Sequence, residues 1–421
     1  MPRKRLAQTA TLLCGLLPAA ALACPAPANA GGSLAGLQSD LGRQLALAGP
    51  ADGAYVYDIT APQPLFSERA TSLRPPASVE KLYTATTALT RMGASARLST
   101  TVYGVGQLGA GGVWEGDLYL RGGGDPTFGS SAFIASHYGG IGASVSTLAA
   151  ELVHTDGIRR ITGSVYGDES FLDSLRGEPS SDYAPDPFLE GTLSGLAFNR
   201  GASGSEHGTH APAAYAAHEL WATLRNDGVS IAGHSGAAST PPGATQLAQV
   251  ASPTLTQLLG LMLPPSDNYF AETLVKDLGA LYGGAGTTSA GAAVVRQTIG
   301  SLLGIHPQVV DGSGLSESDR TSPYQVTDLL AELASTAIGP VLRGDLAVAG
   351  HTGTLALRMR YTGASGRCDA KTGTLTGVSN LAGYCTAADG HTLAFAIFTD
   401  GIPTKTAHVF QDHMAITIAD Y

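Results

Sequence analysis

The sequence predicts an α/β (α+β) fold in which an antiparallel sheet, flanked by helices, is interrupted by a β-rich insertion. Three observations support this prediction. Helical patterns dominate on both sides of residues 97–253, whereas that stretch consists mainly of short alternating segments broken by glycines. Three strand candidates separated by turns then follow near the C-terminus. Such switches between helical and strand periodicity indicate a change of structure along the chain.

The composition is that of a folded protein that does not bind nucleic acid. With 421 residues, 43% of them hydrophobic and 14% charged, the chain can bury a large core and form more than one domain. The formal charge is −10, and the basic run MPRKR stands at the very start. Because nucleic-acid binding needs clustered Lys and Arg, we expect no nucleic-acid partner.

Residues 1–30 are predicted to be a signal peptide. MPRKR supplies a cationic start, residues 12–22 form an apolar stretch, and ALA at 21–23 and ANA at 28–30 fit small-x-small cleavage. The apolar part is too short for a stable anchor, and we expect no transmembrane segment. The protein is therefore expected to be extracytoplasmic, in a periplasm or secreted to the cell wall. Cys24 follows Ala-Leu-Ala and leaves lipidation open.

The elements are predicted in the following order. Residues 37–47 read as a helix, 54–60 and 64–70 as strands that can pair, and 78–93 as a helix after two prolines. The middle stretch contains the strand candidates TTVYGVG, GDLYLRGGG and RRITGSVYGDE, with a helix at 145–154. Helical patterns resume at 255–279, and the last strands are AKTGTL, LAGYCTA and TLAFAIFTDG.

Ser78 and Lys81 are the first candidates for chemistry. Residues three apart on a helix share a face, so the amine can lie beside the hydroxyl. A hydroxyl needs a neighbouring base to become a good nucleophile, and a lysine can be that base if burial and nearby positive charge lower its pKa. Taken alone, the pair is better explained by an N-cap serine followed by a solvated lysine.

Two more motifs supply partners. SDN at 266–268 offers a hydroxyl and an amide that can relay a proton and hold a carbonyl, although Ser and Asp also commonly open helices. KTGT at 371–374 offers a cation, two hydroxyls and a glycine that lets a peptide backbone come close. TGTL occurs again at 352–355, but there it follows His351, where a permanent charge is wanted. We therefore predict 371–375 to be the working copy.

Ser-x-x-Lys, Ser-Asp-Asn and Lys-Thr-Gly in this order are typical of penicillin-binding proteins and class A β-lactamases. The chain resembles the D-alanyl-D-alanine carboxypeptidases/endopeptidases of the class C low-molecular-mass penicillin-binding proteins, serine peptidase family S13. The resemblance covers nearly the whole mature chain through PPASVEKLYTATTAL, LRGGGDPTF, SDNYFAETLVK, DGSGLS, GTLALRMR and AKTGTLTGVSNLAGY. It implies a β-lactamase/transpeptidase-like penicillin-binding domain from residues 31–96 plus 254–421. Residues 97–253 would be the inserted domain or domains, shorter here than in some members.

The resemblance implies catalytic roles for four residues. Ser78 would be the acylated nucleophile and Lys81 its base. Ser266 would pass the proton toward the leaving amine. Lys371 would set the field around Ser266 and the substrate carboxylate.

The resemblance also implies a substrate-binding set. Asn268 would bind the amide carbonyl of the substrate, and Thr372 and Thr374 would donate hydroxyl hydrogen bonds on either side of Gly373. The oxyanion hole would consist of the backbone N–H groups of Ser78 and Thr374, whose loss typically costs a few kcal/mol.

The implied function is that of an exported, penicillin-sensitive serine D,D-peptidase. It would cleave the D-Ala-D-Ala bond of peptidoglycan stem peptides through a Ser78 acyl-enzyme, with endopeptidase action on cross-links left open. No metal or cofactor is expected, and β-lactam antibiotics would be covalent inhibitors. One alternative is a β-lactamase, but the deacylating glutamate of class A enzymes has no Glu-x-x-x-Asn counterpart here. Another is a non-catalytic peptidoglycan-binding scaffold, which would not need Ser78 and Lys81 together.

Other polar residues are assigned to support rather than to chemistry. His207 and His210 lack a third metal ligand at a recognisable spacing, and GGGD at 122–125 is predicted to be a turn. The residues expected to support the site or its loops are Asp267, Asp311, Ser313, Arg358 and Arg360.

Cys368 and Cys385 lie on either side of the KTGTL segment. If the strands around them form a hairpin turning at residues 376–377, the cysteines face each other within disulfide range. Export would allow the bond to persist. If the turn instead centres on Val378, the cysteines slide about 10 Å apart along the strands. The sequence leaves both registers open.

Overall fold

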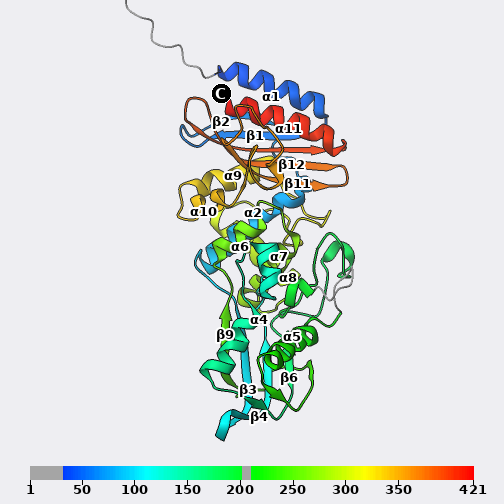
Figure 1. Ribbon diagram of the computed structural model, residues 1–421. Coiled ribbons are helices and arrows are strands. Elements are labelled where there is room, and N and C mark those ends of the chain that lie inside the picture. Colours follow the sequence, from blue (N-terminus) through cyan, green and yellow to red (C-terminus); the bar gives the residue numbers. More distant parts are fainter. Residues whose placement is uncertain (1–31, 202–209) are drawn as a thin grey trace, which may run out of the picture. The chain divides into compact units, whose positions relative to one another are not determined.

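The main sheet of the fold has six strands, all paired antiparallel, in the order β10-β11-β12-β13-β1-β2. Figure 1 shows this computed structural model, which describes residues 32–201 and 210–421. The predicted signal peptide, Cys24 and His207 lie outside these ranges. The strands are β1 (Gly53–Asp58), β2 (Gln63–Glu68), β10 (Ala347–Val348), β11 (Cys368–Leu375), β12 (Val378–Thr386) and β13 (Thr392–Asp400). The expected pairing of the first two strands is confirmed.

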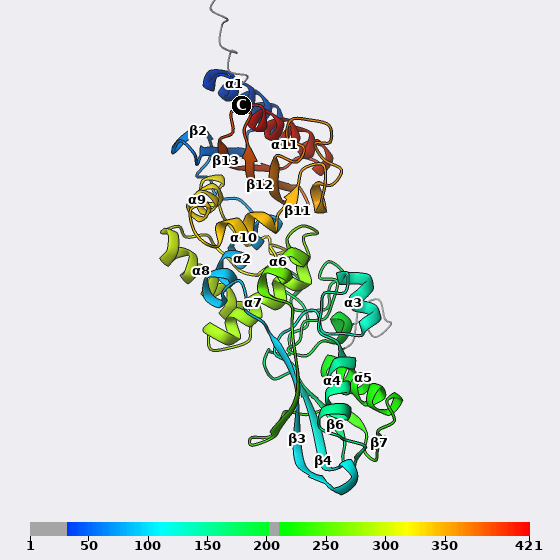
Figure 2. The ribbon, with the colours of Figure 1, turned by 60° about the vertical axis from the view of Figure 1, so that its left-hand side comes forward.

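Helices cover both faces of this sheet. On one face α1 (Leu34–Ala48) and α11 (Thr404–Ala419) lie side by side (Figures 1 and 2). Leu37, Leu41 and Leu45 repeat every four residues on α1, so they share the face that packs on the sheet and α11. The other face packs against a core built from α2 (Lys81–Met92), α6 (Leu255–Met262), α7 (Asn268–Tyr282), α8 (Thr288–Leu303), α9 (Pro323–Ala334) and α10 (Gly339–Gly344).

A second, seven-stranded sheet lies within residues 99–251. Its main path is β7-β5-β4-β3-β9, with β6 paired to β4 and β8 to β6. The strands are β3 (Ser99–Gly109), β4 (Val113–Arg121), β5 (Arg160–Ile161), β6 (Val165–Asp168), β7 (Ser230–Ile231), β8 (Ser235–Ala237) and β9 (Thr245–Ala251). The hairpin β3–β4 is antiparallel, whereas β5 and β6 pair with β4 in parallel.

The helices α4 (Val145–Ala150) and α5 (Pro212–Asn226) pack in the core of this second sheet, whereas α3 (Ser131–Tyr138) buries Ile134 and Tyr138 in the core that covers the main sheet. The helix expected at 145–154 is therefore shorter, because its last turn, Glu151–Thr155, widens to a π-helix. The described residues, 32–201 and 210–421, belong to one compact unit, and the division at 97 and 253 stays a prediction. Within the described ranges, no helix is both long and apolar enough to cross a membrane.

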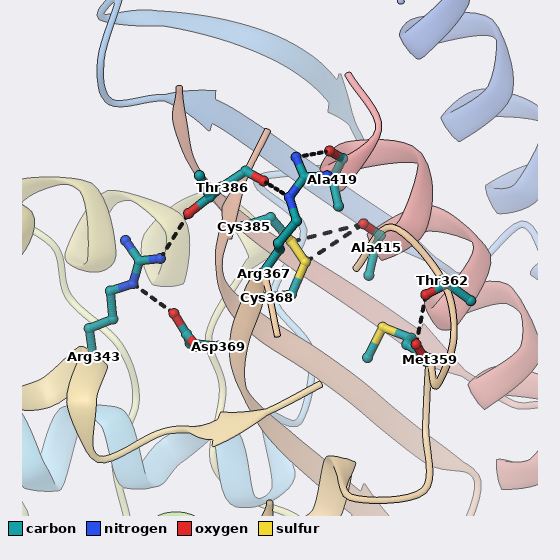
Figure 3. Close-up of a disulfide and its surroundings, with 10 residues drawn as sticks. All are labelled: Arg343, Met359, Thr362, Arg367, Cys368, Asp369, Cys385, Thr386, Ala415 and Ala419. Atoms are coloured by element: carbon teal, nitrogen blue, oxygen red, sulfur yellow. Dashed lines mark hydrogen bonds and ion pairs between the residues drawn. A yellow bond between two sulfur atoms is a disulfide. The ribbon is translucent and has the colours of Figure 1, made fainter. Parts of the chain in front are cut away.

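The hairpin β11–β12 has the register that brings the cysteines together. Leu375 pairs with Val378 and Cys368 pairs with Cys385, so the shorter-turn register is confirmed. The two cysteines form a disulfide with their Cα atoms 4.1 Å apart (Figure 3). Next to it, Arg367 donates to the carbonyl oxygen of Ala419 at 2.6 Å, which ties the start of β11 to α11.

Candidate active site

The segment that carries Ser78 is not yet α-helix. Ala77–Glu80 form a 3₁₀-helix, and α2 begins only at Lys81. In a 3₁₀-helix the side chains three residues apart eclipse each other, which explains why the Lys81 amine lies 2.9 Å from the Ser78 hydroxyl. Ala77 has a φ of +47°, in the left-handed region that non-glycine residues rarely adopt. The chain therefore turns sharply just before Ser78.

The Lys81 amine has three oxygen neighbours. Besides Ser78 Oγ, it contacts Asn268 Oδ1 at 2.7 Å and the Ser313 carbonyl oxygen at 2.7 Å. Burial lowers the pKa of Lys81 to about 8, against the opposing charge of nearby carboxyls. A neutral amine has two N–H donors and one lone pair. The two N–H groups suit the oxygens of Asn268 and Ser313, which can only accept. The lone pair suits the Ser78 hydroxyl, which can donate its proton.

The loop 311–316 holds the Ser313 carbonyl in place. The Asp311 carboxylate accepts the backbone N–H groups of Gly314 and Ser316, both at 2.7 Å. Glu272, on α7, accepts the N–H of Ser313 at 2.8 Å. Asp311 thus supports the loop, as expected. Ser313 does more than expected, because its carbonyl contacts Lys81 directly.

The turn 266–268 joins the two lysines. Ser266 accepts a hydrogen bond from Lys371 at 2.7 Å, while Asn268 reaches Lys81. Ser266 has a φ of +68°, and Asp267 caps α7 by accepting the N–H of Phe270 at 3.0 Å. Lys371 is fully buried, and burial together with the charge of Lys81 holds its pKa well below the usual value.

Strand β11 runs close to the Ser78 segment. A Cβ at Gly373 would lie 2.5 Å from the carbonyl oxygen of Pro76 and 3.2 Å from the backbone nitrogen of Ser78, so only glycine allows this approach. Asn380, paired with Gly373 on β12, donates to the carbonyls of Pro75 and Pro76 at 2.9 and 2.8 Å. The sequence interpretation missed Asn380, although it lies in the quoted GVSNLAGY stretch.

The second copy of TGTL is a neighbour of the first. Residues 353–355 form a 3₁₀ turn, and the Thr354 hydroxyl lies 2.8 Å from that of Thr372. His351 is exposed and its ring lies 3.4 Å from Ser365 Oγ. Thr374, close to the hairpin turn between β11 and β12, is exposed. The structure therefore brings Lys371, and not His351, to the other motifs.

A sequence model of the D-Ala-D-Ala carboxypeptidase 3 (S13) family matches residues 36–186 and 195–421. The chain belongs to this family. The expected peptidase class, a hydrolase acting on D-Ala-D-Ala, is confirmed.

Two individual relatives and one solved structure are consistent with this family and with the predicted fold. The D-alanyl-D-alanine carboxypeptidase of Actinomadura sp. (strain R39) is 31% identical, over 96% of this chain and 89% of that protein. Carboxypeptidase DacB of Mycolicibacterium smegmatis is 30% identical, over 77% of this chain and 71% of that protein. The crystal structure of penicillin binding protein 4 (dacB) from Haemophilus influenzae matches with a TM-score of 0.74 at 22% identity, covering 89% of this chain and 97% of that one. This likeness confirms the predicted fold class.

The remaining residues singled out in the sequence take no part in the hydrogen bonds that join the three motifs. Arg358 pairs with Asp412 at 2.7 Å, and Arg360 donates to the carbonyl oxygen of Ala356 at 2.7 Å, so both support loops. His210 is exposed. Among the residues whose positions are described, no three or more His, Cys, Asp and Glu side chains are grouped to hold a metal ion.

Proposed function

We propose that this S13 peptidase cleaves the D-Ala-D-Ala bond of peptidoglycan stem peptides outside the cytoplasm, through an acyl-enzyme on Ser78. The observation that carries the proposal is the set of contacts around Lys81, a buried amine bonded to Ser78 and to two oxygens that only accept. Residues 31–96 plus 254–421 would be the catalytic part, and 97–253 the inserted part. Export follows from the predicted signal peptide and from the place of the substrate polymer.

Acylation would begin with proton transfer from Ser78 to neutral Lys81. The Ser78 oxygen attacks the carbonyl of the penultimate D-Ala, and the resulting oxyanion is met by the backbone N–H groups of Ser78 and Thr374. Collapse of this intermediate expels the terminal D-Ala amine, which takes a proton through Ser266. The bond from Lys371 orients the Ser266 hydroxyl for this transfer.

Substrate binding would use the edge of β11 and the turn 266–268. One Asn268 Nδ2–H is taken by the carbonyl oxygen of Phe188 at 2.8 Å, which leaves the second to bind the substrate's amide carbonyl. The substrate's terminal carboxylate would meet the hydroxyls of Thr372 and Thr374 in the field of Lys371. Gly373 keeps this edge clear of side chain.

β-Lactams would acylate the same serine, because their strained amide mimics D-Ala-D-Ala. The test is incubation with a labelled penicillin followed by peptide mapping, beside hydrolysis of a D-Ala-D-Ala peptide. We expect stable label on Ser78, loss of label and of hydrolysis in Ser78→Ala, and an unchanged circular dichroism spectrum. Rapid turnover of the drug would indicate a β-lactamase. No label and no hydrolysis would indicate a binding scaffold, and label on another serine would refute the assignment.

A further inference from the structure

Arg200, in the stretch between the first two motifs, reaches the turn 266–268. Its side chain is only 12% exposed. The guanidinium donates to the Asp267 carboxylate and, at 2.7 Å, to the Tyr138 hydroxyl. It also lies 5.3 to 5.4 Å from the ring centroids of Tyr138, Tyr269 and Phe270. The guanidinium is therefore held in one position, because its N–H groups bond to Asp267 and Tyr138 while its flat face lies near the three aromatic rings.

Asp267 is held by two partners at once. One carboxylate oxygen caps α7 through the Phe270 N–H, and the other accepts from Arg200. Its two neighbours in the chain are the residues that contact the site lysines: Ser266 bonds to Lys371, and Asn268 bonds to Lys81. Any movement of Asp267 therefore moves both contacts.

The same stretch makes a second contact to this turn. The Phe188 carbonyl accepts from Asn268 Nδ2, and Gly191 lies against the ring of Tyr269, where a Cβ would be 2.5 Å from the ring edge. Phe188 and Gly191 fall within 187–194, the internal stretch that the family model leaves unmatched. Phe188, which the family model does not match, thus orients the side-chain amide of Asn268, which the model does match.

Arg200 also has an electrostatic effect. Burial lowers the pKa of Lys81, and the Asp267 carboxylate is one of the nearby acids that oppose this shift by favouring the protonated amine. Arg200 offsets that charge at the carboxylate itself. The other charged or titratable groups that act on this lysine or lie beside it are Glu80, Glu272, Asp311 and Lys371.

We propose that Arg200 is a positioning residue for catalysis, which fixes Asp267, and with it Ser266 and Asn268, and offsets part of the Asp267 charge that acts on Lys81. The inference rests on the proposed function of Lys81 as the base. A purely structural role, holding the middle stretch against α7, would affect stability but would leave the ionisation of Lys81 as it is.

The test is the pH profile of acylation by a labelled penicillin, measured between about pH 6 and pH 10 on the full mature protein. The rate should rise with pH as Lys81 becomes neutral. In Arg200→Met the Asp267 charge is no longer offset, so the rise should move to higher pH by about half a unit. The rate at pH 7 should fall about tenfold, because the turn also loses its anchor.

Asp267→Asn provides the opposite shift. Asparagine keeps the helix cap but removes the negative charge, so the rise in rate should move to lower pH. Adding Asp267→Asn to Arg200→Met should bring the profile back toward that of the unmodified protein. Arg200→Lys, which keeps the charge, should leave the profile in place while losing part of the rate. Loosened packing does not produce shifts of opposite sign from two partners.

Arg176 is the matched control. It is 13% exposed, lies in the same stretch, and forms two bonds to Glu169 at 2.7 and 2.8 Å. Arg176→Met should lower stability without moving the pH profile. The proposal is overturned if Arg200→Met and Asp267→Asn leave the profile in place, or if Arg176→Met shifts it equally. If the unmodified protein takes no label on Ser78, the proposed function fails instead.

Discussion

The two copies of TGTL have different structures although their hydroxyl groups touch. Residues 371–375 lie in β11, inside the six-stranded sheet, whereas 353–355 form a 3₁₀ turn. The residue before each copy differs in setting as well as in type. Lys371 is fully buried and bonded to Ser266, while His351 is exposed beside Ser365.

This difference teaches that the partners of a tetrapeptide decide its role. The copy in β11 pairs with β12 and lies so close to the Ser78 segment that Gly373 has no room for a side chain. The copy at 353–355 is attached through Thr354, whose N–H donates to the Pro264 carbonyl at 3.0 Å and whose hydroxyl meets Thr372. It therefore supports the strand from outside.

The sharpest test replaces the residue before each copy by alanine. Lys371→Ala should lower kcat/KM for a D-Ala-D-Ala peptide about a hundredfold to a thousandfold, the scale of losing one preorganised electrostatic stabiliser. His351→Ala should change kcat/KM less than about fivefold. Steady-state kinetics on both variants measures this, and the reverse order would show that the working copy is misassigned.

The second test removes the disulfide at the start of β11. Replacing Cys368 and Cys385 by alanine should lower the free energy of unfolding by about 3 kcal/mol, the value expected for closing a loop of this length. Denaturant unfolding of the oxidised protein and the double variant gives the difference. Two titratable thiols in the unfolded, unreduced protein would contradict the bond itself.

The third test concerns the glycines of the two copies. Gly373→Ala places a Cβ 2.5 Å from the Pro76 carbonyl, so β11 must move from Ser78, and acylation by penicillin should slow about tenfold. Gly353 has a φ of +55°, and its Cβ would lie 2.2 Å from the Pro264 carbonyl. Gly353→Ala should therefore act mainly on stability, by about 1–2 kcal/mol. Equal acylation rates in both variants would remove the distinction.

The smallest effect is expected at the shared hydroxyl contact. Thr372→Val removes a hydroxyl that bonds to Thr354 and that we propose to bind the substrate, whereas Thr354→Val removes only the support. We expect KM to rise about fivefold in the first and about twofold in the second, in line with one hydrogen bond of about 1 kcal/mol. A larger effect from Thr354→Val would mean that Thr354 itself binds substrate.

Local signals were enough to predict much of the fold and part of the site. The strands from 368 to 400 have the apolar content and turn residues that define a hairpin series, and the cysteine positions agree with the register that forms. Each of the three motifs could be recognised because its residues lie within four positions of one another in the sequence. The 3₁₀ start at Ala77–Glu80 was not predicted, since sequence patterns do not separate it from an α-helical turn.

The residues that were missed act across long distances in the chain. Asn380 bonds the carbonyls before Ser78, and the Ser313 carbonyl bonds Lys81. Such contacts use backbone atoms or ordinary polar side chains, so the sequence carries no pattern for them. Arg200 is the same case, because nothing near it in the sequence indicates Asp267.

The pairing of β1 with β13 has a consequence for how the protein is made. Strands β1 and β2 are synthesised early, but they find their place only when β13 and then α11 emerge at the end of the chain. Until then the sheet that holds Lys371 cannot close, and a newly made chain has exposed strand edges and no working site. Because such late, non-local pairing is slow, we expect peptidase activity to arise only after synthesis is complete.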